Sequence, residues 1–131
     1  MTAEQIGDVV FRHEQPGASR DAIARFSEAT EDPNPIHTDP AFAKACGFPQ
    51  VIAQGPMTTA HFARLLARTY GAARLRVLDL TFTAPVFPDE PLVLTATLAK
   101  PGDDLMLDLV AAKLDGTVTA KGFAQVSGDG S

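Results

Sequence analysis

The chain has 131 residues, with 11 lysines and arginines against 16 aspartates and glutamates, so its formal net charge at pH 7 is −5. This length suits one compact domain, and we expect a single domain over 1–131. The acidic balance argues against a general nucleic-acid-binding protein, because such domains are normally basic. The single cysteine, Cys46, excludes an internal disulfide and any metal site built from several cysteines.

Hydropathy argues for a cytoplasmic protein that does not span a membrane. Hydrophobic residues make up 45% of the chain and charged residues 21%, which is enough apolar content for a packed core. No apolar run approaches the roughly 18 residues of a membrane-spanning helix, and residues 1–8 lack a signal-like basic and apolar start. A short frayed tail is expected at about 127–131.

Three helices are predicted in the first half of the chain. One over 20–30 follows Ser19, a typical N-cap residue. A short one over 40–46 follows Asp39, another typical cap, and starts with proline. The third, over 56–70, has apolar residues around much of its circumference, so we expect most of it to be buried.

The second half is predicted to form antiparallel strands. Four proline-free segments have the length and alternation of strands, at 75–83, 92–100, 105–114 and 118–126. Asp-Gly at 115–116 favours a type I′ hairpin turn. Helices followed by such a meander indicate an α+β fold in which the sheet wraps the long helix.

The segment 32–39, Asp-Pro-Asn-Pro-Ile-His-Thr-Asp, concentrates an acid, an amide and an imidazole in eight residues. Asp32 and Asn34 each precede a proline, which disfavours helical backbone and stiffens the loop. A carboxylate and an imidazole on such a loop can converge on one water molecule, so Asp32 and His37 are candidate acid–base residues. An ordinary turn explains the segment about as well, with Asp39 serving only as a helix cap.

Metal binding receives little support from this segment. A calcium loop starting at Asp32 would place His37 where glycine is required and Ala43 where a bidentate acid is required. A transition-metal site would lack a second histidine nearby. We therefore expect no metal and no cofactor.

A Gly-Pro pair leads into the long helix. Gly55 lets a ligand approach the backbone, and the start of a helix offers unpaired N–H groups that suit an oxygen gaining negative charge. Because Pro56 has no N–H, the donor of such an oxyanion hole would be Gly55 or Met57. The alternative is a helix entry without chemistry.

Together, these segments resemble the MaoC-like dehydratase family, which includes the (R)-specific enoyl-CoA hydratases of the hot-dog fold. The family signature Asp-x-Asn-Pro-x-His-x-Asp is matched at 32–39. A later element, an aromatic residue followed by Pro-Val-x-Pro and an acid, is matched at 82–89. The resemblance covers nearly the whole chain and implies a single hot-dog domain, with a long central helix wrapped by an antiparallel β-sheet.

The resemblance also implies a hydro-lyase that reversibly hydrates a trans-2-enoyl thioester to a 3-hydroxyacyl thioester. Asp32 and His37 would activate water, Asn34 would position them, and the N–H of Gly55 would stabilise the enolate. Substrates would be thioesters of coenzyme A or acyl carrier protein. A homodimer or higher homo-oligomer is expected, with a heteromer as an alternative.

The chain departs from the family pattern at two places. Family members commonly have His-Gly-Met where this chain has Gln-Gly-Pro-Met at 54–57, and glutamine can hydrogen-bond but cannot titrate near neutrality. Ala60 lies where hydratases often supply a hydroxyl, so a contact to the Asp32–His37 pair is either missing or provided by Thr58 or Thr59. We therefore expect Gln54 and Thr58 to lie at the substrate, with Gln54 acting structurally.

Two other interpretations remain open. A hot-dog thioesterase would commonly use a carboxylate on or near the central helix, and 40–78 contains none. A non-catalytic MaoC-like partner subunit is also compatible with the departures at 54–57.

The segment 40–78 carries five cations and no carboxylate. Such a segment favours either a landing area for an anionic carrier or a solvated face. The cations are Lys44, Arg64, Arg68, Arg74 and Arg76.

Four further side chains are expected to take no part in chemistry. His13 is predicted to be exposed, and His61 to be a packed or rim histidine. Cys46 is predicted to be a buried, inert thiol. Tyr70 is predicted to be a core or interface ring.

Overall fold

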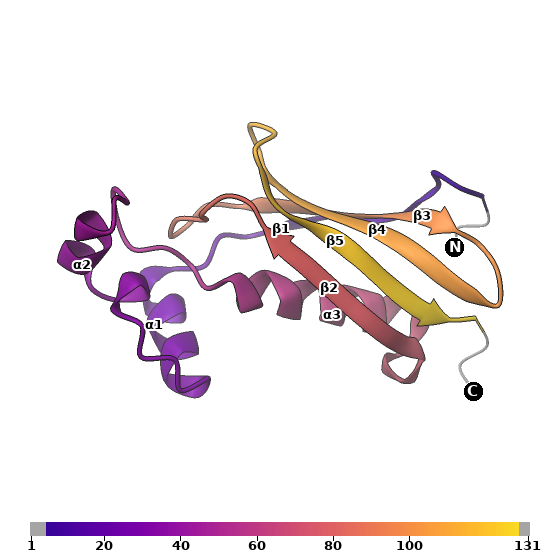
Figure 1. The fold of residues 1–131 in the computed structure, drawn as a ribbon, viewed down its shortest axis with the longest axis horizontal. Coiled ribbons are helices and arrows are strands. Elements are labelled where there is room, and N and C mark those ends of the chain that lie inside the picture. The colour runs from indigo at the N-terminus through magenta and orange to yellow at the C-terminus, as the bar shows by residue number, and fades with distance from the viewer. Residues whose placement is uncertain (1–4, 129–131) are drawn as a thin grey trace.

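The computed structural model describes residues 5–128 and shows one five-stranded antiparallel sheet with the strand order β1-β3-β4-β5-β2 (Figure 1). The strands are β1 (Val9–Gln15), β2 (Leu75–Phe82), β3 (Leu92–Lys100), β4 (Asp104–Lys113) and β5 (Val118–Ser127). Strands β3, β4 and β5 follow one another through hairpins, and β1 and β2 form the two edges. Inward residues of β3 alternate strictly with less buried ones, as expected for a sheet with one covered face.

Three α-helices precede most of the sheet in the chain. They are α1 (Arg20–Ala29), α2 (Pro40–Ala45) and α3 (Gly55–Tyr70), with 3-10 turns η1 (Pro35–His37) and η2 (Ala72–Arg74). Ser19 caps α1 by accepting from the N–H of Ala22, and Asp39 caps α2 through its Oδ1, so both predicted caps are confirmed.

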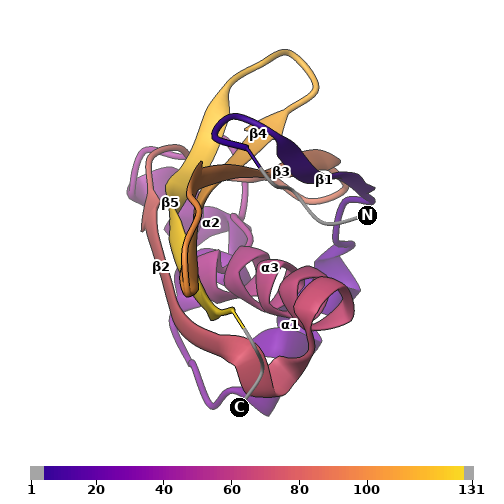
Figure 2. The same cartoon turned by 90° about the vertical axis from the view of Figure 1, so that its right-hand side faces the viewer.

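The core lies between α3 and the concave face of the sheet, which curves around this helix (Figure 2). The buried side of α3 presents Phe62, Leu65, Leu66 and Tyr70 to inward-facing residues of β3, β4 and β5. Each fully buried side chain of this size contributes about 1.5–3 kcal/mol. The predicted α+β arrangement, a long helix wrapped by an antiparallel sheet, is confirmed.

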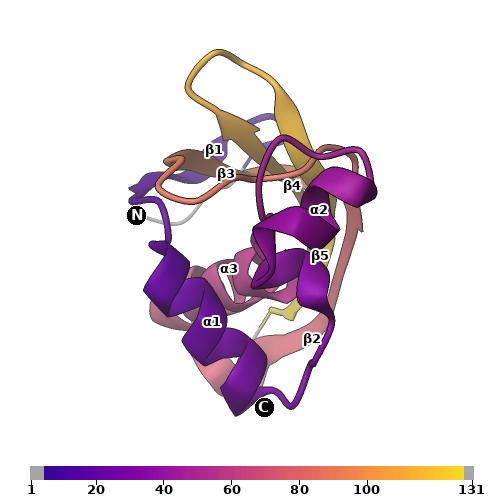
Figure 3. The same cartoon turned by 90° about the vertical axis from the view of Figure 1, so that its left-hand side faces the viewer.

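Helices α1 and α2 lie at the end of the molecule where α3 begins, with α2 farther out than α1 (Figures 1 and 3). Only Ile23 and Ser27 of α1 are buried, and only Ala43 of α2. These two helices therefore contribute little to the core. The loops that follow them connect to the start of α3.

Several expectations need correction. Strand β1 was not predicted, and His13 lies within it, half-buried and bonded to Gln15, rather than on a free polar segment. Cys46 is exposed instead of buried, because α2 covers the molecule with only one residue. The turn before β5 has positive φ only at Gly116, so it is not of type I′.

Ser127 is the buried last residue of β5, so it is not part of a frayed tail, and the rest of the predicted tail at 129–131 lies outside the described residues. Within 5–128, no helix has the length and apolar character needed to cross a membrane.

Candidate active site

The end of α1 fixes the backbone of Asp32. The N–H of Asp32 donates to the carbonyl of Ser27 at 2.9 Å, and the N–H of Glu31 donates to the carbonyl of Glu28 at 3.2 Å. This pair of bonds is a Schellman closure, which requires a left-handed residue just beyond the helix. Glu31 occupies that position with φ of 54°, where glycine is the usual residue because a Cβ is strained there.

Asn34 orders the loop between Asp32 and η1. Its N–H donates to Oδ1 of Asp32 at 3.2 Å, and its own Oδ1 accepts from the N–H of Ile36 at 3.1 Å. The asparagine therefore caps η1 and holds one carboxylate oxygen of Asp32. The second carboxylate oxygen is left to face His37.

His37 is held in one orientation by the loop before α3. Its Nδ1 lies 2.8 Å from the carbonyl oxygen of Ile52, and its Nε2 lies 3.9 Å from Oδ2 of Asp32. A carbonyl can only accept, so Nδ1 carries a proton, and Nε2 of the neutral ring is the basic nitrogen. The His37 side chain is 11% exposed and that of Asp32 44%, so the pair opens to solvent on the carboxylate side.

A cavity of about 370 Å³ borders His37. We call it the inner cavity. Its volume lies in the range of small-molecule sites. Its polar wall is formed by His37, Gln54, Gly55, Thr58 and Thr83, and its apolar wall includes Phe48, Ile52, Phe82, Pro85 and Val86.

Gly55 begins α3 on the wall of the inner cavity. A Cβ at this position would lie 2.8 Å from the ring of Phe82, so the close approach requires glycine. Among the described residues, its N–H has no hydrogen-bond partner. The N–H of Met57 donates to the carbonyl of Gln54 at 3.1 Å and is therefore engaged. Of the two donors considered from the sequence, only Gly55 is available to a ligand.

Gln54 borders the same cavity but turns its amide nitrogen towards α1. Nε2 donates to the carbonyl of Ile23 at 2.9 Å and to Oγ of Ser27 at 2.7 Å. The side chain is buried, and within 5–128 its Oε1 has no hydrogen-bond partner. Sequence reasoning did not identify Ser27, whose only signal is its position on the buried face of α1, four residues after Ile23.

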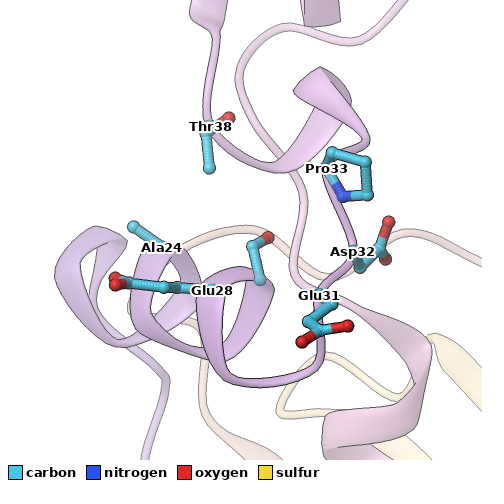
Figure 4. A pocket seen from close by; sticks show the side chains of 7 residues that line it. Ala24, Glu28, Glu31, Asp32, Pro33 and Thr38 are labelled. Carbon is cyan, nitrogen blue, oxygen red and sulfur yellow. The ribbon is translucent and has the colours of Figure 1, made fainter.

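A second depression, the outer hollow, lies on the α1 side of Asp32 and has a volume of about 460 Å³ (Figure 4). Glu28, Glu31 and Asp32 line it, and the Asp32 carboxylate points away from that of Glu28. Three carboxylates repel an anionic ligand. The inner cavity, which contains no carboxylate in its wall, is therefore the better site for one.

His61 and Tyr70, also predicted to take no part in chemistry, both have shifted pKa values. Burial, followed by the charges of Arg64 and His13, lowers the pKa of His61, which lies half-buried on a separate small cavity that Gln54 and Thr58 also line. Burial raises the pKa of Tyr70, while Arg74 opposes the shift. Tyr70 is buried in the core, as predicted.

The basic residues of 40–78 do not gather at the inner cavity, and none of them lines it. Arg74 lies beyond the far end of α3, where it donates to the carbonyls of Ser127 and Gly128. Lys44 lies on α2, near the opposite end of the molecule. A landing area for an anionic carrier and a solvated basic face therefore both stay predictions, and neither includes the wall of the inner cavity. Within the described residues, no three or more His, Cys, Asp or Glu side chains are placed to hold a metal ion.

Residues 2–115 match the family model for the MaoC like domain. The chain is 35% identical over 101 residues to 3-hydroxyacyl-thioester dehydratase Y of Mycobacterium tuberculosis, covering 70% of this chain and 35% of that protein. It is 31% identical over 99 residues to the mitochondrial 3-hydroxyacyl-[acyl-carrier-protein] dehydratase of Arabidopsis thaliana, covering 75% of this chain and 58% of that protein. The chain thus spans 35% and 58% of the lengths of these relatives.

The fold also matches a solved structure over almost its full length. The (R)-hydratase from A. caviae involved in PHA biosynthesis superposes with a TM-score of 0.84, at 23% identity, covering 97% of this chain and 98% of that one. This likeness establishes the shared hot-dog architecture. Because the family model covers most of the sequence, the chain belongs to the MaoC-like domain family.

Proposed function

We propose that the protein reversibly adds water to a trans-2-enoyl thioester, giving a 3-hydroxyacyl thioester. The observation that carries this proposal is the 2.8 Å contact between Nδ1 of His37 and the carbonyl of Ile52. It turns Nε2 towards Asp32, and His37 and Gly55 line the same cavity. One site thus offers a group that removes a proton and a group that stabilises an oxyanion.

Asp32 and His37 would share the proton chemistry. A water molecule between them loses a proton to the pair, and its oxygen forms a bond to carbon 3 of the enoyl group. The double-bond electrons move to the thioester oxygen, forming an enolate. The pair then returns a proton to carbon 2, so one water is added in total and no oxidant or reductant is required.

The N–H of Gly55 would stabilise the enolate. It lies at the positive end of α3, and a preorganised donor at such a position favours a developing negative charge. The Thr58 hydroxyl lines the same cavity and would contact the substrate near this oxygen. The apolar wall that includes Phe48 and Val86 would surround the acyl chain.

The substrate would be carried by coenzyme A or acyl carrier protein, and the protein would work as an oligomer. Both edge strands, β1 and β2, are unpaired on one side within the described chain. The outer face of the sheet exposes Val77, Val110 and Phe123. Such edges and apolar residues are usually covered, which favours a homodimer or pairing with a related subunit. Light scattering on the purified protein tests this point.

The main experiment follows the loss of enoyl absorbance when purified protein is mixed with crotonyl-CoA and longer 2-enoyl thioesters. We expect turnover by the wild type, and a loss of roughly 10²–10⁴-fold in kcat for Asp32→Asn and for His37→Ala. His13→Ala is the matched control, because it removes an imidazole from β1, away from the inner cavity, and should leave kcat unchanged.

Three results would contradict the proposal. Equal rates for wild type, Asp32→Asn and His37→Ala would remove the proposed pair from the reaction. Release of free thiol without loss of the enoyl group would identify a thioesterase. Activity only after co-expression with a second MaoC-like chain, still insensitive to these substitutions, would identify a non-catalytic partner subunit.

A further inference from the structure

We infer that Gln54 and Ser27 form a positioning pair that fixes Asp32 relative to the N–H of Gly55. The inference rests on the proposed hydration and adds to it two residues that act through others. The proposed chemistry needs the proton-transfer pair and the oxyanion donor in a fixed relation, yet they come from different elements. Asp32 follows α1, whereas Gly55 begins α3.

Ser27 connects to both sides of the site through different atoms. Its side-chain Oγ accepts from Nε2 of Gln54 at 2.7 Å, and its carbonyl accepts from the N–H of Asp32 at 2.9 Å. Gln54 directly precedes Gly55, and its carbonyl accepts from the N–H of Met57 in the first turn of α3. A short series of bonds therefore runs from the backbone of Asp32 to the start of α3.

Burial makes this connection rigid. Gln54 is 3% exposed and Ser27 is 9% exposed, so water competes poorly for their bond. The orientation of the amide is also determined, because Nε2 meets two acceptors, Ser27 Oγ and the Ile23 carbonyl. Turning the amide over would place Oε1 against the Ile23 carbonyl, which is repulsive.

The other bonds near this site hold η1 and not α1: Ile52 accepts from His37 and donates to the Ile36 carbonyl. Within 5–128, the bonds of Gln54 are the only hydrogen bonds or ion pairs that join α1 to the start of α3. Helix α1 otherwise contributes only Ile23 and Ser27 to the buried interior. Loss of the Gln54 amide would therefore let α1, and Asp32 with it, shift relative to Gly55.

The first experiment measures how firmly the Asp32 amide is held and does not depend on activity. Hydrogen exchange of the Asp32 amide is compared in wild type, Gln54→Met and the milder Ser27→Ala. We expect exchange at Asp32 to accelerate at least tenfold in Gln54→Met and by a smaller factor in Ser27→Ala. Thr69→Val is the matched control, because it also removes one hydroxyl bond, to the Leu65 carbonyl, but at the far end of α3. Unchanged Asp32 exchange in both variants would overturn the inference.

The second experiment uses kinetics. With an enoyl thioester, Gln54→Met should lower kcat by roughly 10- to 100-fold while KM changes by less than about threefold, since misplaced groups affect the reaction more than binding. Adding Gln54→Met to Asp32→Asn should reduce kcat by less than about twofold, because a positioning effect disappears once its target is disabled. Thr69→Val should leave kcat unchanged in both backgrounds.

The outcomes separate this inference from the proposed function. If Gln54→Met lowers kcat by the same factor in the wild-type and Asp32→Asn backgrounds, Gln54 does not act through Asp32. That result would overturn the inference. A wild type that hydrates no enoyl thioester would overturn the proposed function. The exchange experiment would still decide whether the pair holds Asp32.

Discussion

The two ends of α3 belong to one continuous helix but are built on different principles. At the far end, Leu65, Leu66 and Tyr70 pack against the sheet and are at most 7% exposed. At the start, Gly55 borders a cavity of about 370 Å³, and its N–H has no partner within the described residues. The helix is sixteen residues, or about 24 Å, long from Gly55 to Tyr70.

The comparison indicates that the packing that stabilises the fold and the proposed chemistry lie at opposite ends of one helix. Apolar packing at the far end stabilises the fold and fixes the direction of the helix axis. The open start keeps polar groups available, and it is held in place by hydrogen bonds from Gln54 instead of by bulky side chains. Changes at the two ends should therefore have separable consequences.

The largest expected effect comes from damaging the packed end. Leu66→Ala removes a side chain that is 1% exposed, and the cavity it leaves should lower the free energy of unfolding by about 2–5 kcal/mol. Chemical denaturation measures this loss. Below the unfolding transition, kcat with an enoyl thioester should stay within about twofold of wild type. A large fall in kcat of fully folded Leu66→Ala would show that the two ends are not separable.

The converse change is Gly55→Ala at the open start. The new Cβ would lie 2.8 Å from the Phe82 ring, so either the ring or the start of α3 must shift. We expect kcat to fall by roughly 10- to 100-fold, because a donor displaced from the oxyanion loses much of its stabilisation. Denaturation should show a loss of only about 1 kcal/mol, since the half-exposed Phe82 ring takes up part of the overlap and the start of α3 takes up the rest.

A double variant identifies the cause of this effect. Phe82→Leu makes room for the methyl group, so Gly55→Ala/Phe82→Leu should recover part of the lost kcat relative to Gly55→Ala. Phe82→Leu alone provides the reference. If the double variant is no faster than Gly55→Ala, crowding by the ring is not the reason for glycine at this position.

Features with local signals could be predicted from the sequence. Ser19 and Asp39 are both caps because the oxygen that satisfies the first helical N–H groups lies on the capping residue itself. The apolar pattern of 56–70 and the alternation of 92–100 also depend on residues close in sequence. These patterns locate the three helices and four of the five strands along the chain without knowledge of tertiary contacts.

Features that depend on distant partners could not be predicted. Strand β1 exists because it pairs with β3, more than seventy residues later, and its own residues alternate only weakly. The bond from Gln54 to Ser27 spans 27 residues and has no local signature. The family resemblance brought Gln54 to attention, but only the structure shows which way its amide points.

The Schellman closure before Asp32 could not be predicted for another reason: Glu31 stands where glycine is usual. Replacing Glu31 gives the smallest expected change in stability. Glu31→Gly should raise the free energy of unfolding by roughly 0.5–1 kcal/mol: relief of left-handed strain outweighs the added freedom of the unfolded chain. Glu31→Ala removes the same carboxylate but keeps the Cβ, so it should not reproduce the gain. If denaturation shows equal stabilisation in both variants, the gain comes from removing a carboxylate that repels the other carboxylates of the outer hollow. Backbone strain at Glu31 would then not be its cause.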